Sequence, residues 1–157
     1  MRVRTLLTEL WLPRPIDEVF AFFSDAHNLD VLTPPWLHFR ILTPQPIELR
    51  LGAIIEYSIR WRWFPLSWRT EIAAWEPTRR FVDRQVKGPY SQWVHEHTFE
   101  PRDGGTFLRD RVDYAVPGWF LEPVVDRVIV GPDVRRIFDY RRAKMVELFP
   151  AREGVST

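Results

Sequence analysis

Alternation of apolar and polar residues through the middle of the chain is the strongest constraint on its fold. Over residues 53–63, aromatic and aliphatic residues, Trp63 included, alternate with charged and hydroxyl residues, and the same period of two continues over residues 66–75. This period is typical of β-strands with one buried face. Residues 81–87, 93–100 and 107–116 are three further predicted strands. Short links rich in Gly and Pro join them, which predicts an antiparallel meander.

The segment before these strands predicts a mixture of strand and helix. Residues 3–11 are a predicted strand, and residues 15–24 carry apolar side chains at helical spacing behind a proline suited to a helix start. Residues 25–32 are a second short helix, which the sequence Thr33-Pro34-Pro35 ends. Residues 37–42 add a short strand, so about seven strands are expected.

The C-terminal segment returns to helical spacing. Residues 118–130 are a predicted helical lead-in, which Gly131-Pro132 breaks or kinks. An apolar stripe then runs to Pro150 and predicts a helix of about 17 residues, about 26 Å long. With 157 residues, we expect one domain over residues 1–150 and a flexible tail at 151–157.

This order of elements predicts an α+β fold. A curved antiparallel sheet of about seven strands would wrap a long C-terminal helix, with two short helices after the first strand. The chain is also rich in aromatic residues, at 15%, and aromatic side chains can fill a core or wall a cavity. The side chains expected to line a cavity are Tyr57, Trp61, Trp68, Trp93, Tyr114 and Phe138, although each is also compatible with ordinary core packing.

A combination of short motifs extends along nearly the whole chain. The motifs are Pro15-Ile16-Asp17-Glu18-Val19-Phe20, Leu32-Thr33-Pro34-Pro35-Trp36, Trp75-Glu76-Pro77, Gly88-Pro89-Tyr90, Trp93-x-His95-x-His97-x-Phe99, Asp110-Arg111-Val112 and Ile137-Phe138-x-Tyr140-Arg141. The combination resembles bacterial ligand-binding SRPBCC-domain and polyketide cyclase or dehydratase-like proteins of the START-like superfamily, which includes birch-pollen-allergen-like proteins. The resemblance implies a helix-grip fold with an apolar cavity. It implies no particular reaction, because one fold hosts many functions.

Polar residues gather on one face of the predicted sheet. Trp93 and Phe99 flank two histidines on the same face of their strand, which indicates that this face is the inner one. A tight loop at Gly104-Gly105 would set a carboxylate of the next strand opposite one of these histidines. The expected polar cluster comprises Asp83, Gln85, His95, His97 and Asp110.

Two interpretations of this cluster are open. A histidine held by a carboxylate can act as a general acid or base, which would make His95, His97 and Asp110 catalytic. Alternatively, the polar groups satisfy one another or orient a ligand, because a buried polar group is costly without a hydrogen bond. The pattern His-x-His can also hold a metal. Because the chain has no cysteine and the surroundings are partly apolar, we expect no metal here.

Arg141 is a further candidate, at the edge of the C-terminal apolar stripe. Its guanidinium could reach Asp83 or Asp110, anchor an acidic ligand head, or extend past the apolar side chains into water. No P-loop or dinucleotide fingerprint occurs in the sequence, so no cofactor is expected.

The predicted function is binding of a hydrophobic or amphipathic small molecule in an internal cavity between the sheet and the C-terminal helix. The alternatives are a cyclase or dehydratase that uses the His/Asp pair, and a protein-interaction module whose core is filled by its own Trp and Phe side chains. The net charge is +1, so nucleic acid is not an expected partner. No segment resembles a signal peptide or membrane span, so we expect a cytoplasmic protein without stable membrane insertion. The oligomeric state is open.

Overall fold

The structure is a computed structural model that describes residues 1–44, 46–118 and 121–152. Its strands are β1 (Arg4–Leu12), β2 (Arg40–Ile41), β3 (Ile54–Trp61), β4 (Phe64–Glu76), β5 (Arg80–Lys87), β6 (Gln92–Arg102) and β7 (Gly105–Ala115). Within the described residues they form one seven-stranded sheet in the order β1-β7-β6-β5-β4-β3-β2, and every neighbouring pair is antiparallel. The predicted meander is therefore confirmed.

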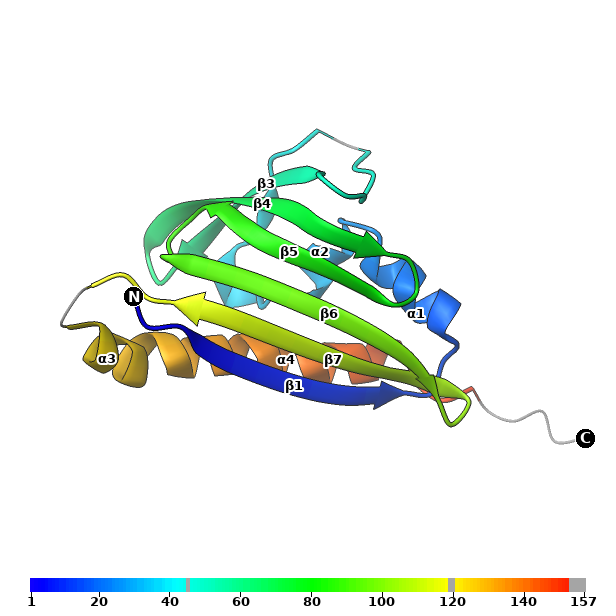
Figure 1. Cartoon of the computed structure of the whole chain (residues 1–157). Coiled ribbons are helices and arrows are strands. Elements are labelled where there is room, and N and C mark those ends of the chain that lie inside the picture. Colours follow the sequence, from blue (N-terminus) through cyan, green and yellow to red (C-terminus); the bar gives the residue numbers. More distant parts are fainter. Residues whose placement is uncertain (45, 119–120, 153–157) are drawn as a thin grey trace, which may run out of the picture.

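The helices lie on the concave side of the curved sheet (Figure 1). They are α1 (Ile16–Phe23), α2 (Asn28–Leu32), a 3₁₀ turn (Pro35–Leu37), α3 (Glu122–Val125), a π-helical turn (Asp126–Val130) and α4 (Gly131–Leu148). The long helix α4 runs along the sheet beside β7 and β1. The predicted α+β helix-grip architecture, with two short helices after the first strand, is confirmed.

The expected interruption at Gly131-Pro132 takes the form of a π-helical turn. The Gly131 N–H donates to the carbonyl oxygen of Asp126, and Pro132 lies in the first turn of α4, where a missing N–H leaves no helical bond unmade. A Cβ atom at position 131 would lie 2.9 Å from the Asp126 carbonyl oxygen, so glycine permits the turn. Residues 119–120 of the expected lead-in and 153–157 of the expected tail lie outside the described residues.

The alternation expected for β4 is wrong beyond Ile72, because the strand contains a bulge there. The pairing of β4 with β5 shifts by one residue between Ile72 and Ala74, and the extra residue reverses the side-chain alternation beyond it. Trp75, which a strict period of two places on the outer face, therefore packs inward, with ring centroids 5.3 Å from Phe20 and 5.6 Å from Phe81.

The turn between β3 and β4 lies two residues earlier than expected. Strand β3 ends at Trp61, and Arg62 adopts a left-handed conformation with φ of 57°. The turn therefore consists of Arg62 and Trp63. The alternation of residues 53–63 places Trp63 on the inner face, but its side chain is 74% exposed at the tip of the hairpin.

Two groups of buried apolar residues connect the helices to the sheet. One joins α1 and the end of α4 to the sheet through residues such as Phe20, Phe99 and Met145. The other joins the start of α4 to β7 through Val112 and Val134. None of the helices in the described parts of the chain has the length and apolar character that a membrane crossing requires.

Candidate functional site

A cavity of about 400 Å³ lies between the sheet and α4. Its walls are largely aromatic and aliphatic, with contributions from α1, β3, β4, β5, β6 and α4. Small-molecule sites in proteins typically have volumes of about 300–1,000 Å³. The alternative in which Trp and Phe side chains fill the core therefore does not describe this protein.

The structure places most of the expected ligand-binding residues on the cavity wall. Those that line the cavity are Tyr57, Trp61, Trp68, Asp83, Trp93, His95, His97, Phe138 and Arg141. Three others lie outside the wall. The Gln85 amide exchanges two hydrogen bonds with the backbone of Tyr90 in the β5–β6 turn. Tyr114 donates from its hydroxyl to Asp126 Oδ1 at 3.0 Å, and Asp110 lies behind the histidines.

Strand pairing brings the acidic and imidazole side chains together. Asp83 on β5 lies directly opposite His95 on β6, and Asp110 on β7 lies directly opposite His97. Since cross-strand neighbours share a face of the sheet, all four side chains project to the concave side. The register therefore decides which histidine faces which carboxylate.

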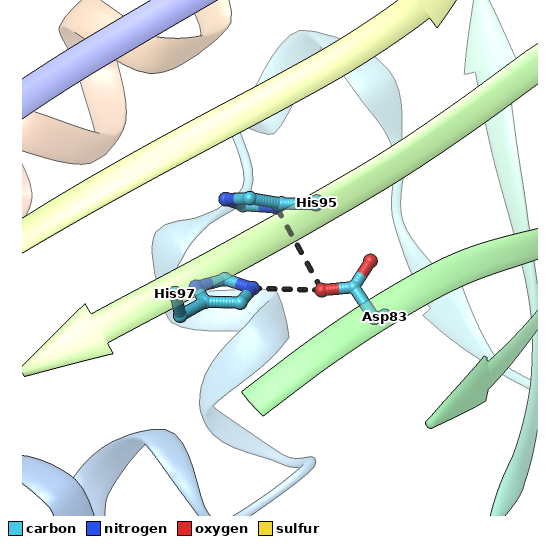
Figure 2. A group of neighbouring side chains, drawn as sticks. All are labelled: Asp83, His95 and His97. Atoms are coloured by element: carbon cyan, nitrogen blue, oxygen red, sulfur yellow. Dashed lines mark hydrogen bonds and ion pairs between the residues drawn. The ribbon is translucent and has the colours of Figure 1, made fainter. Parts of the chain in front are cut away.

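The side chains cross over to form a compact cluster. His97 Nε2 lies 2.7 Å from Asp83 Oδ2, and His95 Nε2 lies 3.0 Å from Asp110 Oδ1. His95 Nδ1 is 3.7 Å from the same Asp83 oxygen (Figure 2). His97 Nδ1 is 2.9 Å from Asp110 Oδ1 but is not aligned with it for a hydrogen bond. Each imidazole is thus held between two carboxylates.

Arg141 on α4 extends the cluster toward the helix. Its side chain is buried, Nε lies 3.7 Å from Asp110 Oδ2, and the guanidinium carbon lies 5.3 Å from the centre of the Phe23 ring. Of the positions open to it from the sequence, the arginine therefore takes the one beside Asp110. Its Nε has no hydrogen-bond partner among the described residues.

Burial and neighbouring charge act in opposition on the carboxylates. Burial alone would raise the pKa of Asp83 and of Asp110. The charge of His95 and the hydrogen bond from His97 instead lower the pKa of Asp83, and Arg141 with His95 holds the pKa of Asp110 well below its usual range. Both carboxylates are therefore ionised.

The two imidazoles differ in basicity. Burial, followed by the charge of His97, lowers the pKa of His95. Burial acts the same way on His97, but its contacts with Asp110 and Asp83 outweigh burial and raise its pKa. His97 is therefore the histidine that holds a second proton more readily.

Aromatic rings fix the orientation of both histidines. The two imidazole centroids are 3.7 Å apart, Phe81 stacks on His97 at 4.0 Å, and Phe138 meets His95 edge-on at 5.3 Å. Phe81 is not among the residues expected at the site, although the alternation of β5 places it on the same face as Asp83. Tyr90 is not among them either, because a turn residue has no alternation to orient it, yet it packs against Trp93 at 4.8 Å on the cavity wall.

Similar folds occur in solved structures from several organisms. Protein CV1439 from Chromobacterium violaceum has a TM-score of 0.72 and 13% identity, covering 95% of this chain and 98% of that one. Protein Ms6760 from Mycobacterium smegmatis has a TM-score of 0.67 and 18% identity, covering 94% and 96%. The major latex-like protein 151 from Panax ginseng has a TM-score of 0.68 and 10% identity, covering 94% and 97%. At these identities the likeness shows the fold alone.

Sequence comparison identifies the family. No curated protein matches the chain. The sequence model of the family described as "Polyketide cyclase / dehydrase and lipid transport" matches residues 12–136, a span that runs from the end of β1 into α4 and includes Asp83, His95, His97 and Asp110. The chain belongs to the polyketide cyclase / dehydrase and lipid transport family.

Proposed function

We propose that the chain binds an amphipathic small molecule whose apolar body occupies the cavity and whose polar group meets Asp83, His95 and His97. The observation that carries this proposal is the asymmetry of the cavity. Its walls are mostly aromatic and aliphatic, and the carboxylate and imidazole groups of β5 and β6 occupy one part of them. Apolar walls with a few convergent polar groups are typical of small-molecule sites. The family description supports a lipid or polyketide type of ligand.

The polar wall favours a ligand group that both accepts and donates hydrogen bonds. His97 is the more basic of the two histidines, and Asp83 is a hydrogen-bond acceptor that also lines the cavity. A hydroxyl or enol could accept from one and donate to the other. A purely hydrocarbon ligand would exclude water from these groups without offering them a hydrogen bond, and would bind less favourably.

A cavity-filling variant tests this proposal. Ile55 lines the cavity and is 2% exposed, whereas Val86 is 52% exposed on β5. We expect Ile55→Trp to weaken binding of a fluorescent fatty-acid or aromatic probe by at least about tenfold, because the indole would occupy the ligand's space. Val86→Trp is the matched control and should bind normally. Failure of the unmodified chain to take up any probe of a broad lipid and aromatic panel would contradict the proposal.

Acid–base catalysis of the cyclase or dehydratase type is a second candidate. Asp110 accepts from His95 Nε2 at 3.0 Å, and His95 also lines the cavity. That arrangement leaves Nδ1 available to take a proton from a bound molecule. On an identified substrate, His95→Gln should lower kcat by about a hundredfold or more while probe affinity is largely kept. Unchanged kcat would remove His95 from such a mechanism.

A further inference from the structure

On each imidazole, one ring nitrogen lies near Asp110 and the other lies near Asp83. Asp110 Oδ1 lies 3.0 Å from His95 Nε2 and 2.9 Å from His97 Nδ1. The remaining nitrogens, His95 Nδ1 and His97 Nε2, lie 3.7 and 2.7 Å from Asp83 Oδ2. Figure 2 shows both rings directed toward this one carboxylate oxygen, and each of the three residues offers a ligand atom within 4.8 Å of the other two.

This arrangement places three atoms that can each donate an electron pair to a metal ion within 4.8 Å of one another. When each neutral imidazole carries its proton on the nitrogen nearest Asp110, His95 Nδ1 and His97 Nε2 are both lone pairs, and both face an ionised carboxylate oxygen. Three such atoms repel one another unless a cation lies between them. A proton at His97 Nε2 satisfies the contact with Asp83 but leaves His95 Nδ1 without a partner in the cluster. A metal ion would satisfy all three.

We propose that Asp83, His95 and His97 form a binding site for a divalent transition-metal ion of the Zn²⁺ or Fe²⁺ class, with Asp110 as the positioning residue behind both imidazoles. Two histidines and one carboxylate, with further coordination positions free, are the ligand set of many zinc and non-haem iron sites. The distances of 2.7 and 3.7 Å to Asp83 Oδ2 bracket the about 3.3 Å that separates ligand atoms at zinc bond lengths in a tetrahedron.

The surroundings match those of a metal centre. Histidine ligands usually donate their second N–H to a carboxylate, which fixes the tautomer and the ring orientation. Asp110 is hydrogen-bonded to His95 Nε2 in this way and lies 2.9 Å from His97 Nδ1. Two ionised carboxylates oppose one guanidinium, that of Arg141, so the site has an excess of negative charge when both imidazoles are neutral. The expectation of no metal relied on the absence of cysteine and on the partly apolar surroundings. The absence of cysteine is no obstacle for a donor set of nitrogen and oxygen.

The cavity supplies the free coordination positions. Asp83, His95 and His97 all line it, whereas Asp110 does not. An ion held by these three residues would face the cavity, where an oxygen atom of a carbonyl, carboxylate or enol could complete its coordination. The inference goes beyond the proposed function and does not rest on it, since the ion would bind in the absence of any organic ligand.

Cobalt titration of the full chain tests the site. After treatment with a chelator, the protein should bind one Co²⁺ per chain, with the visible absorption of a four- or five-coordinate ion, and Zn²⁺ should displace it. His97→Ala and Asp83→Ala should lose this absorption. His27 and His38 are exposed, so the double variant His27→Gln/His38→Asn is the control for surface binding and should behave as the unmodified chain.

Asp110→Asn provides a test that keeps all three ligands. Loss of a carboxylate behind a histidine ligand typically weakens metal binding by about 10- to 100-fold, and circular dichroism of each variant reports whether it folds. The proposal is overturned if the unmodified chain binds neither Co²⁺ nor Zn²⁺ at millimolar concentration. It is equally overturned if folded His97→Ala binds as well as the unmodified chain. Because no organic ligand is present, either result is independent of probe uptake by the cavity.

Discussion

The indole Nε1 of Trp61 donates a hydrogen bond of 2.9 Å to Oδ2 of Asp133. The bond joins the last residue of β3 to the first turn of α4, and both residues line the cavity. The guanidinium of Arg62 lies 3.8 Å from the same carboxylate oxygen. A polar contact between residues 72 positions apart therefore links the sheet to the helix at the cavity wall.

Removal of this hydrogen bond should speed the exchange of ligand. We expect Trp61→Phe to raise both the association and the dissociation rate of a fluorescent probe several-fold, because the ring remains but the link to α4 is lost. The free energy of unfolding should fall by about 1 kcal/mol, the usual net contribution of one hydrogen bond. Stopped-flow fluorescence measures the rates. Trp63→Phe, at the exposed tip of the same hairpin, is the control, and equal rates in both variants would show that the contact does not restrict access.

Asp110 and Arg141 should be energetically coupled. Asp110→Asn leaves the buried guanidinium without its counter-charge and should lower the free energy of unfolding by about 3 kcal/mol. Arg141→Met removes the cation and keeps an apolar side chain of similar length. The double variant should be more stable than the sum of the two losses predicts, by about 1 kcal/mol or more. Urea unfolding of the four proteins measures this coupling, and strictly additive losses would mean that the 3.7 Å contact contributes nothing.

Much of the fold follows from local patterns. Period-two alternation with short links determines an antiparallel meander. The concave apolar face of that sheet is the surface against which a helix of the predicted length can pack. The same alternation placed Asp83, His95 and Asp110 on a common face. The sequence left open which histidine faces Asp110, because that depends on the register, and the register depends on the turn at residues 103–104.

Other features depend on contacts that alternation does not encode. Trp75 turns inward because a bulge adds one residue to β4, and no residue type marks the bulge. Gln85 shares the inner face with Asp83, but its amide satisfies the backbone of a tight turn and is therefore kept from the cavity. The contact between Trp61 and Asp133 joins two distant segments, so it becomes visible only when α4 lies across the sheet.

Gly105, which begins β7, should tolerate no side chain. A Cβ atom there would meet the carbonyl oxygen of Leu12 and lie 2.7 Å from the ring of Trp11, and the paired strand β1 cannot move away. We expect Gly105→Ala to lower the free energy of unfolding by about 2 kcal/mol, the usual cost of overpacking. At Gly88 a Cβ would meet only the side chain of Gln85, which can rotate. Chemical denaturation should therefore show a smaller loss for Gly88→Ala, and the opposite order would contradict this account.

Three tyrosines should make the protein sensitive to alkali. Burial raises the pKa of Tyr57 and Tyr90. Burial and the hydrogen bond to Asp126 raise the pKa of Tyr114 to about 12. In the unfolded chain a tyrosine ionises near about pH 10. Above that pH the unfolded chain releases protons that the folded chain retains, so stability that is complete below about pH 10 is lost as the pH rises toward 12.

The Tyr114→Phe variant isolates one of these groups. Its phenol donates to Asp126, so ionisation would replace the donated proton with a negative charge beside a carboxylate. At neutral pH the variant should be less stable, because it lacks the hydrogen bond. Between about pH 10 and 12 its free energy of unfolding should fall less steeply than that of the unmodified chain, because one fewer proton is released on unfolding. Urea unfolding across this range, with tyrosinate absorbance followed in parallel, measures both effects. Ionisation of all the tyrosines near pH 10 in a chain that stays folded would contradict the prediction.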